Sequence, residues 1–167
     1  NMEGPFLDPV KKGAHVEGYI RKPDIEFFRA CNEAAGGMIK LVTLAPNMEG
    51  SEEFIRELHN EVVISIGHTA ADYGCAAEAM KEEALHVTHL YNAMSALQHR
   101  EPGLVGAIMD DDRVSCSIVP DGYHVSYPAI RIAKKVMGSR LFAITDAVTT
   151  TTSGFYQHVF EGDRYTA

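Results

Sequence analysis

The stretch "EVVISIGHTAADYGCAAEAM", Glu61 to Met80, joins an apolar run of strand length to a segment with helical spacing. The run Val62–Ile66 is rich in β-branched residues and nearly continuous rather than alternating, which favours a parallel strand covered on both faces. His68 stands just after the run, and small residues at helical spacing follow it. The stretch therefore predicts one strand followed by one helix, and the fold depends on how often this unit recurs.

The unit recurs along most of the chain. Apolar runs of strand length also occupy residues 38–46, 85–89, 113–120 and 140–147, and segments with helical spacing occupy residues 23–37, 51–60 and 126–138. Strand and helix alternate at about 25 to 30 residues per unit, which predicts an α/β fold with a parallel sheet. A closed eight-stranded barrel and an open doubly wound sheet both fit. The nucleotide-binding forms of the open sheet are less favoured because no GxGxxG or GxxxxGK[ST] motif follows a strand.

Composition narrows the possible partners. The 167 residues are 46% hydrophobic, and no apolar run approaches the roughly 18 to 20 residues that cross a bilayer. The formal charge of −8 disfavours a broad nucleic-acid surface but leaves room for a local positive pocket that binds a small anion. The three cysteines show no metal-binding spacing and predict a reducing, cytoplasmic compartment. We expect neither a nucleic acid nor a membrane as partner.

Residues able to bind metal or to move protons stand at several strand ends. His68 and His89 each follow an apolar run, Asp146 follows a third, and Glu3 belongs with them if the chain begins at the end of another strand. Because the carboxyl ends of parallel strands converge, these side chains are expected to form one site. Two imidazoles and a carboxylate suit a divalent cation, which can activate water, and Asp146 could then transfer protons.

Each of these residues also has a structural interpretation. A histidine at a strand end can be a hydrogen-bonded structural residue, and an aspartate there can cap a helix; the similar placement on three strands favours a functional site. His15 and His124 lie in the glycine-containing loops "KKGAH" and "PDGYH". By spacing alone, these two are equally compatible with a functional and a structural role.

Five motifs in this order resemble the N-acetylglucosamine-6-phosphate deacetylase family of the amidohydrolase superfamily: "MEGPFLDPVKKGAH", "GHTAADYG", "THLYNAMSALQHREPGLVGA", "VPDGYHV" and "AITDAV". "THLYNAM" followed by "REPG" is the most specific of them. The resemblance implies a (β/α)₈ TIM-type barrel beside a small β-sandwich. It also implies hydrolysis of the acetamide of N-acetylglucosamine 6-phosphate to glucosamine 6-phosphate and acetate.

The resemblance also implies roles for individual residues. It makes Glu3, His68 and His89 the ligands of a divalent metal, with Zn²⁺ favoured and Fe, Co or Mn as alternatives. It makes Asp146 the catalytic acid/base and His15 the residue that polarises the carbonyl. Substrate contacts are implied for Ala14, Asn92, Ala93, Arg100 and His124. The position of Arg100 corresponds to an arginine that reaches the partner subunit's substrate, which implies a homodimer.

The chain departs from the family in its extent. Asn1 stands where the family usually has histidine, and about six of eight barrel strands can be found. The sequence therefore predicts an incomplete barrel over residues 1–153 that is part of a longer protein and that we do not expect to be active alone. Residues 154–167 alternate around Glu161-Gly162-Asp163 and predict the start of a hairpin that continues into the missing barrel and sandwich residues.

Two other functions compete with the deacetylase hypothesis. One is a different amidohydrolase, acting on a cyclic amide or a nucleobase; the "HLYNAM" motif and Arg100 favour a sugar phosphate instead. The other is a binding module that keeps the sugar-phosphate pocket without chemistry. Retention of all four central residues, Glu3, His68, His89 and Asp146, weighs against such a module.

Overall fold

Six parallel strands form one sheet in the order in which they occur along the chain. The computed structural model describes residues 1–147, 157–160 and 163–166. The strands are β1 (Met2–Glu3), β2 (Leu41–Leu44), β3 (Val63–Ile66), β4 (His86–Val87), β5 (Ser115–Ile118) and β6 (Leu141–Ala143), and each pairs with the next. Within the described chain β6 does not pair with β1, so the sheet is open. This confirms the α/β class and the incomplete barrel.

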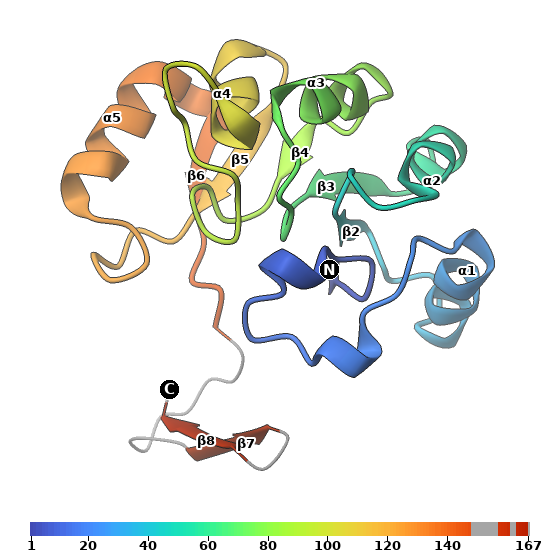
Figure 1. Cartoon of the computed structure of the whole chain (residues 1–167). Coiled ribbons are helices and arrows are strands. Elements are labelled where there is room, and N and C mark those ends of the chain that lie inside the picture. The colour runs from blue at the N-terminus through green and yellow to red at the C-terminus, as the bar shows by residue number, and fades with distance from the viewer. Residues whose placement is uncertain (148–156, 161–162, 167) are drawn as a thin grey trace.

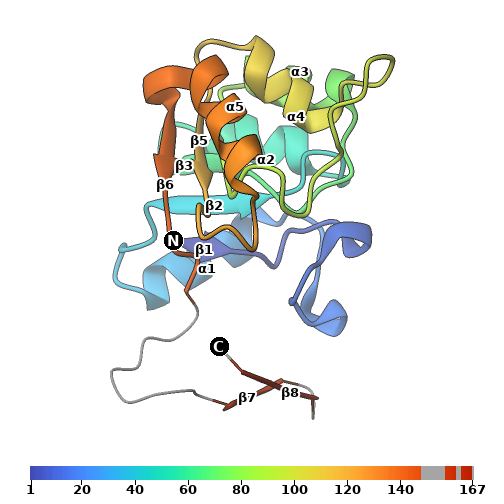
Figure 2. The same cartoon turned by 90° about the vertical axis from the view of Figure 1, so that its left-hand side faces the viewer.

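Helices follow the strands and cover the outer side of the sheet (Figure 1). They are α1 (Ile25–Ala34), α2 (Ser51–Leu58), α3 (Tyr73–Lys81), α4 (Gly103–Asp110) and α5 (Tyr127–Met137), with short 3₁₀ turns η1 (Pro9–Lys11), η2 (Glu17–Tyr19) and η3 (Gly138–Arg140). Figure 2 shows α5 alongside β5 and β6. Aspartate side chains cap α1 and α3, because Asp24 accepts from the Phe27 N–H at 2.9 Å and Asp72 from the Cys75 N–H at 2.8 Å.

The two faces of the sheet differ in chemistry. Along β2 and β3, the apolar residues Val42, Leu44, Ile64 and Ile66 alternate with Thr43 and Ser65, and all six are buried. Alternate residues of a strand point to opposite faces. The apolar set joins the core formed with the helices, which includes Phe28, Phe54, Leu58, Met80 and Leu104. The hydroxyl groups therefore lie on the concave face, where functional groups from different strands can meet.

Buried hydroxyl groups of this concave face bond to one another. Thr88 Oγ1 lies 2.9 Å from Thr43 Oγ1 and 2.6 Å from Ser65 Oγ, so one threonine joins β2, β3 and the end of β4. Because buried polar groups are costly when unpaired, these bonds let the inner face stay polar. These hydroxyl groups adjoin the predicted site, since Thr88 immediately precedes His89 in the chain.

The sequence patterns did not reveal α4. Its sequence, "GLVGAIMD", has no polar stripe, and six of its residues are buried. Arg140 holds the C-terminal end of α4 and the segment before β5. Its Nη1 donates hydrogen bonds to three backbone carbonyl groups, at 3.3 Å to Ile108, 3.0 Å to Asp111 and 2.9 Å to Val114.

The tail contains the predicted hairpin. Strands β7 (Gln157–Phe160) and β8 (Asp163–Thr166) pair antiparallel, with Phe160 opposite Asp163. The turn residues 161–162 and the proposed boundary at 153/154 lie outside the described residues, so the division into domains stays a prediction. Among the helices that the structure describes, none combines the length and hydropathy needed to cross a bilayer.

Candidate metal centre

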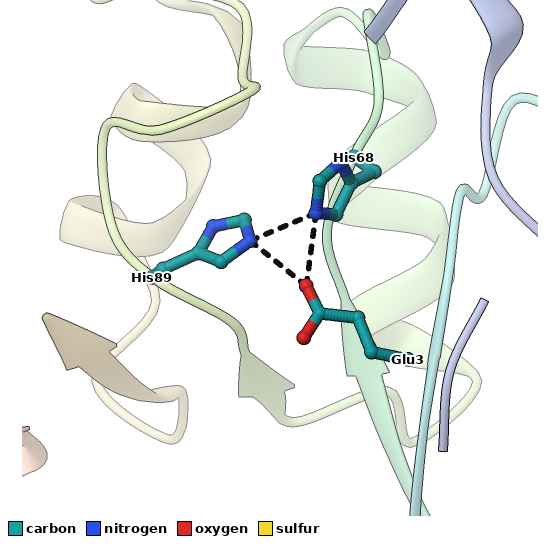
Figure 3. A group of neighbouring side chains, drawn as sticks. All are labelled: Glu3, His68 and His89. Atoms are coloured by element: carbon teal, nitrogen blue, oxygen red, sulfur yellow. Dashed lines mark hydrogen bonds and ion pairs between the residues drawn. The ribbon is translucent and has the colours of Figure 1, made fainter. Parts of the chain in front are cut away.

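Three predicted ligands, far apart in the sequence, meet at the concave face of the sheet. Glu3 belongs to β1, His68 comes two residues after β3, and His89 two residues after β4. Glu3 Oε1 lies 2.9 Å from His68 Nε2 and 3.0 Å from His89 Nε2, and the two nitrogen atoms are 3.0 Å apart (Figure 3). The structure thus brings one oxygen and two nitrogen donors to a single point.

The backbone at the strand ends adopts an uncommon conformation. The φ angles of His68, His89 and Asp146 are 47°, 39° and 54°, in the left-handed region that residues other than glycine rarely occupy. Such conformations cost on the order of 1–3 kcal/mol each and concentrate at functional sites. All three lie in the loops that follow parallel strands, as expected for a site built at the carboxyl edge of the sheet.

Hydrogen bonds hold His68 through its ring and His89 through its backbone. His68 Nδ1 lies 2.8 Å from the carbonyl oxygen of Lys11. A carbonyl only accepts, so Nδ1 donates, and a neutral His68 then carries its lone pair on Nε2, the atom that faces Glu3. The backbone N–H of His89 donates to Ser117 Oγ at 2.9 Å. His89 Nδ1 is buried without a hydrogen-bond partner among the described residues.

Glu3 and His89 each stabilise the charged form of the other. Burial opposes ionisation of Glu3, but hydrogen bonds from His68 and His89, which Nε2 of each ring donates when it carries a proton, outweigh it and hold the pKa of the Glu3 carboxyl well below its usual range. Burial also opposes protonation of His89, yet Glu3 and Asp146 raise its pKa overall. Two imidazole nitrogens 3.0 Å apart repel each other unless a proton or a cation separates them. The donor set therefore fits a divalent cation that accepts nitrogen and oxygen ligands.

The two predicted catalytic residues lie around this cluster. The His15 ring packs edge-on against His68 with 4.9 Å between ring centroids, and burial together with the charge of His68 lowers the pKa of His15. Asp146 is exposed, and its charge acts to raise the pKa of both His15 and His89. Ala14, beside His15 in the chain, is also exposed.

The predicted substrate contacts fall into two groups. Asn92 and Ala93 belong to the loop that carries His89: the Asn92 N–H donates to the His89 carbonyl at 3.0 Å, and the Ala93 carbonyl accepts from the Thr69 N–H at 3.0 Å. Arg100 and His124 are exposed on other loops, and among the described residues no hydrogen bond or ion pair joins them to the cluster. His124 Nδ1 donates instead to an Asp121 carboxylate oxygen at 2.6 Å.

Sequence reasoning missed several residues that hold the cluster in place. The buried residues Asp8 and Thr69 form a hydrogen-bonded network beside His68 through the exposed Asn47, and Lys11 acts through its backbone carbonyl. Among these residues, only Asp8 carried a sequence signal: it precedes Pro9, and an aspartate followed by proline is typical of the start of a helical turn.

Comparison with known proteins gives one consistent result. No protein-family model matches the chain. A curated relative from Bacillus subtilis, N-acetylglucosamine-6-phosphate deacetylase, is 43% identical over 150 residues, which cover 89% of this chain and 38% of the relative. The protein of the same name from Bos taurus is 36% identical over 166 residues, which cover 95% of this chain and 41% of that protein.

A solved structure extends the comparison to the fold. An aspartate-to-alanine mutant of N-acetyl-D-glucosamine-6-phosphate deacetylase from Mycobacterium smegmatis, in complex with N-acetyl-D-glucosamine-6-phosphate, superimposes with a TM-score of 0.88 at 34% identity. The match covers 99% of this chain and 46% of that one. The chain spans about two fifths of the length of the curated relatives it matches. The resemblance found in the motifs is therefore confirmed: in sequence and in fold, the chain matches one portion of the N-acetylglucosamine-6-phosphate deacetylases.

Proposed function

We propose that the chain is the catalytic portion of a metal-dependent hydrolase that converts N-acetylglucosamine 6-phosphate and water into glucosamine 6-phosphate and acetate. The convergence of Glu3, His68 and His89 at hydrogen-bond separations carries this proposal. The similarity to deacetylases named for this substrate supports the substrate class.

Each residue of the cluster has a defined task in this reaction. Glu3, His68 and His89 hold the divalent cation, which supplies Lewis-acid activation of water when bound. Asp146 takes a proton from the attacking water and returns it to the amide nitrogen as the C–N bond breaks. His15, held edge-on beside His68, donates a hydrogen bond to the acetamide oxygen, where negative charge develops.

Hydrogen-bond donors on other loops suit the phosphate. Arg100 and His124 are exposed, and we assign them to the phosphate end, with Ala14, Asn92 and Ala93 against the sugar. In an acidic chain of net charge −8, such a local patch would attract a dianion. We further propose a homodimer in which Arg100 reaches the partner's site, Zn²⁺ as the favoured metal, and a cytoplasmic location, which suits the three free thiols.

The test uses the full-length protein and measures both metal content and acetate release. His89→Ala should lower bound metal, whereas Asp146→Asn should retain metal and lose about 10²–10⁴-fold in turnover, the usual contribution of a general acid/base. His59→Ala is the matched control, since His59 is the C-cap of α2 and, among the described residues, bonds only to Ile55, Arg56 and Asn60. Full metal occupancy in His89→Ala, or normal turnover in Asp146→Asn, would refute the assigned roles.

Substrate comparison separates the competing functions. We expect acetate release from N-acetylglucosamine 6-phosphate and no turnover of dihydroorotate or adenine. Turnover of either of the latter would favour another amidohydrolase, and tight binding of the sugar phosphate without acetate release would favour the binding module.

A further inference from the structure

A buried carboxylate outside the metal cluster bonds to three loops at once. Asp8 is 5% exposed and lies in the loop that follows β1. Its Oδ1 accepts from the Val10 N–H at 2.9 Å. Its Oδ2 accepts from Asn47 Nδ2 at 2.7 Å and from the Ala70 N–H at 3.1 Å. These donors belong to the loops after β1, β2 and β3, and the last of these loops carries His68.

Asp8 reaches His68 by two routes. The backbone N–H of Asp8 donates to the His68 carbonyl at 3.0 Å, which holds the main chain where φ is 47°. The Asp8 carboxylate also caps η1, and the Asp8 carbonyl accepts from the Lys11 N–H at 2.9 Å. The carbonyl of that same Lys11 accepts from His68 Nδ1 at 2.8 Å. One residue thus controls both the backbone and the ring of His68.

Asn47 extends this network to the residue after His68. Asn47 gives its amide hydrogen to Asp8 and accepts from the Thr69 hydroxyl through Oδ1 at 2.5 Å. Thr69 Oγ1 in turn accepts from the Ala71 N–H at 3.0 Å. All three donors to Asp8 need an acceptor, and an ionised carboxylate offers acceptor oxygens only.

We propose that Asp8 is a positioning residue for the metal centre: by capping the Pro9–Lys11 turn, it holds the Lys11 carbonyl against His68 Nδ1 and so directs the Nε2 lone pair toward Glu3 and His89. The inference rests on the proposed metal function of these three residues. A different aspartate supplies the contrast, because Asp24 also caps a helical segment but touches none of the three ligands.

The test is a Co²⁺ titration of the full-length, metal-depleted protein followed by visible absorption, beside circular dichroism to establish folding. Asp8→Ala should weaken Co²⁺ binding about 10- to 100-fold, as loss of groups that orient metal ligands does. Asp8→Asn keeps an oxygen to cap the turn but presents an amide group to the two former donors at Oδ2, Asn47 and the Ala70 N–H, so it should weaken binding by less than about tenfold. Asp24→Ala should leave Co²⁺ affinity unchanged while lowering thermal stability.

The outcomes separate this inference from the proposed function. Wild-type protein that binds no Co²⁺ would overturn both. Wild-type affinity in Asp8→Ala would overturn the positioning role alone, as would an Asp8→Asn variant that binds as weakly as Asp8→Ala, because the effect would then come from charge rather than from the cap. If Asp8→Ala does not fold, Asp8→Asn decides: measurable weakening of Co²⁺ binding by less than about tenfold supports the inference, whereas unchanged binding or a weakening of about tenfold or more refutes it.

Discussion

Replacing Gly67 by alanine should disturb the packing of Thr43 and Thr88 next to the candidate metal centre. Gly67 immediately precedes His68, and a Cβ atom at this position would lie 2.8 Å from Thr43 Cγ2 and 3.2 Å from Thr88 Cβ, where ordinary contact begins near 3.4 Å. The φ angle of Gly67 lies outside the left-handed region, so the penalty is steric rather than conformational. Thr43 is fully buried and cannot turn into solvent.

The expected cost combines two effects. Inserting a methyl group into a packed interior costs about 1–3 kcal/mol. Moving Thr43 also strains its 2.9 Å hydrogen bond to Thr88, worth about 1 kcal/mol. We therefore expect Gly67→Ala to reduce the free energy of unfolding by about 2–4 kcal/mol and to weaken Co²⁺ binding through displacement of His68.

A second substitution makes the argument refutable. Thr43→Ser removes the methyl group at 2.8 Å but keeps the hydroxyl, so Gly67→Ala should cost at least about 1 kcal/mol less in the Thr43→Ser background. Denaturant unfolding of the four metal-free proteins measures this coupling. Gly18→Ala is the control, since no atom lies within 4 Å of the added methyl group. A coupling near zero, or a Gly67→Ala protein as stable as wild type, would refute the packing argument.

Three further predictions address stability and reactivity. Arg140→Met should lower the free energy of unfolding by about 2–3 kcal/mol in denaturant titrations, because three carbonyl groups lose a charged donor, and it should leave Co²⁺ affinity unchanged. Burial raises the pKa of Cys116 to about 12, so mass spectrometry after iodoacetamide treatment should find Cys116 unmodified in the folded protein and alkylated only after unfolding, whereas rapid native labelling would contradict its burial. In metal-free protein, His89→Gly should be about 1 kcal/mol more stable than His89→Ala, because only glycine is relaxed at a φ of 39°; the reverse order in unfolding experiments would show that no strain is stored there.

The parts of the fold that could be predicted are those with a periodic signal. The unit from Glu61 to Met80 shows a continuous apolar run followed by helical spacing, and the structure places β3 within it and ends α3 one residue beyond it, at Lys81. Helix α4 could not be predicted because all of its residues except the last, Asp110, are apolar, so no period marks it. A buried helix without a polar face is indistinguishable in one sequence from a buried strand or loop.

Some residues of the candidate site could be predicted from the sequence, and others could not. Histidines after apolar runs pointed to His68 and His89, because parallel strands bring their carboxyl ends to one edge. Spacing could not decide the role of His15, and its edge-on packing against His68 appears only in three dimensions. Asp8 carried no metal-ligand pattern, since it acts through a backbone carbonyl and through bonds to loops distant in sequence.

The left-handed conformations at the metal centre explain why the supporting network is so extensive. His68 and His89 each leave their strand in a conformation that costs on the order of 1–3 kcal/mol, and a site under such strain persists only where neighbouring contacts determine it. Asp8 and Lys11 hold His68 from the main chain and the ring, while Ser117 holds the backbone of His89. Below them, Thr88 joins the hydroxyl groups of two other strands. Because each of these contacts joins two residues of the chain and none runs through an ion, they can order the ligands independently of the cation, and we expect the centre to bind metal as a preformed site.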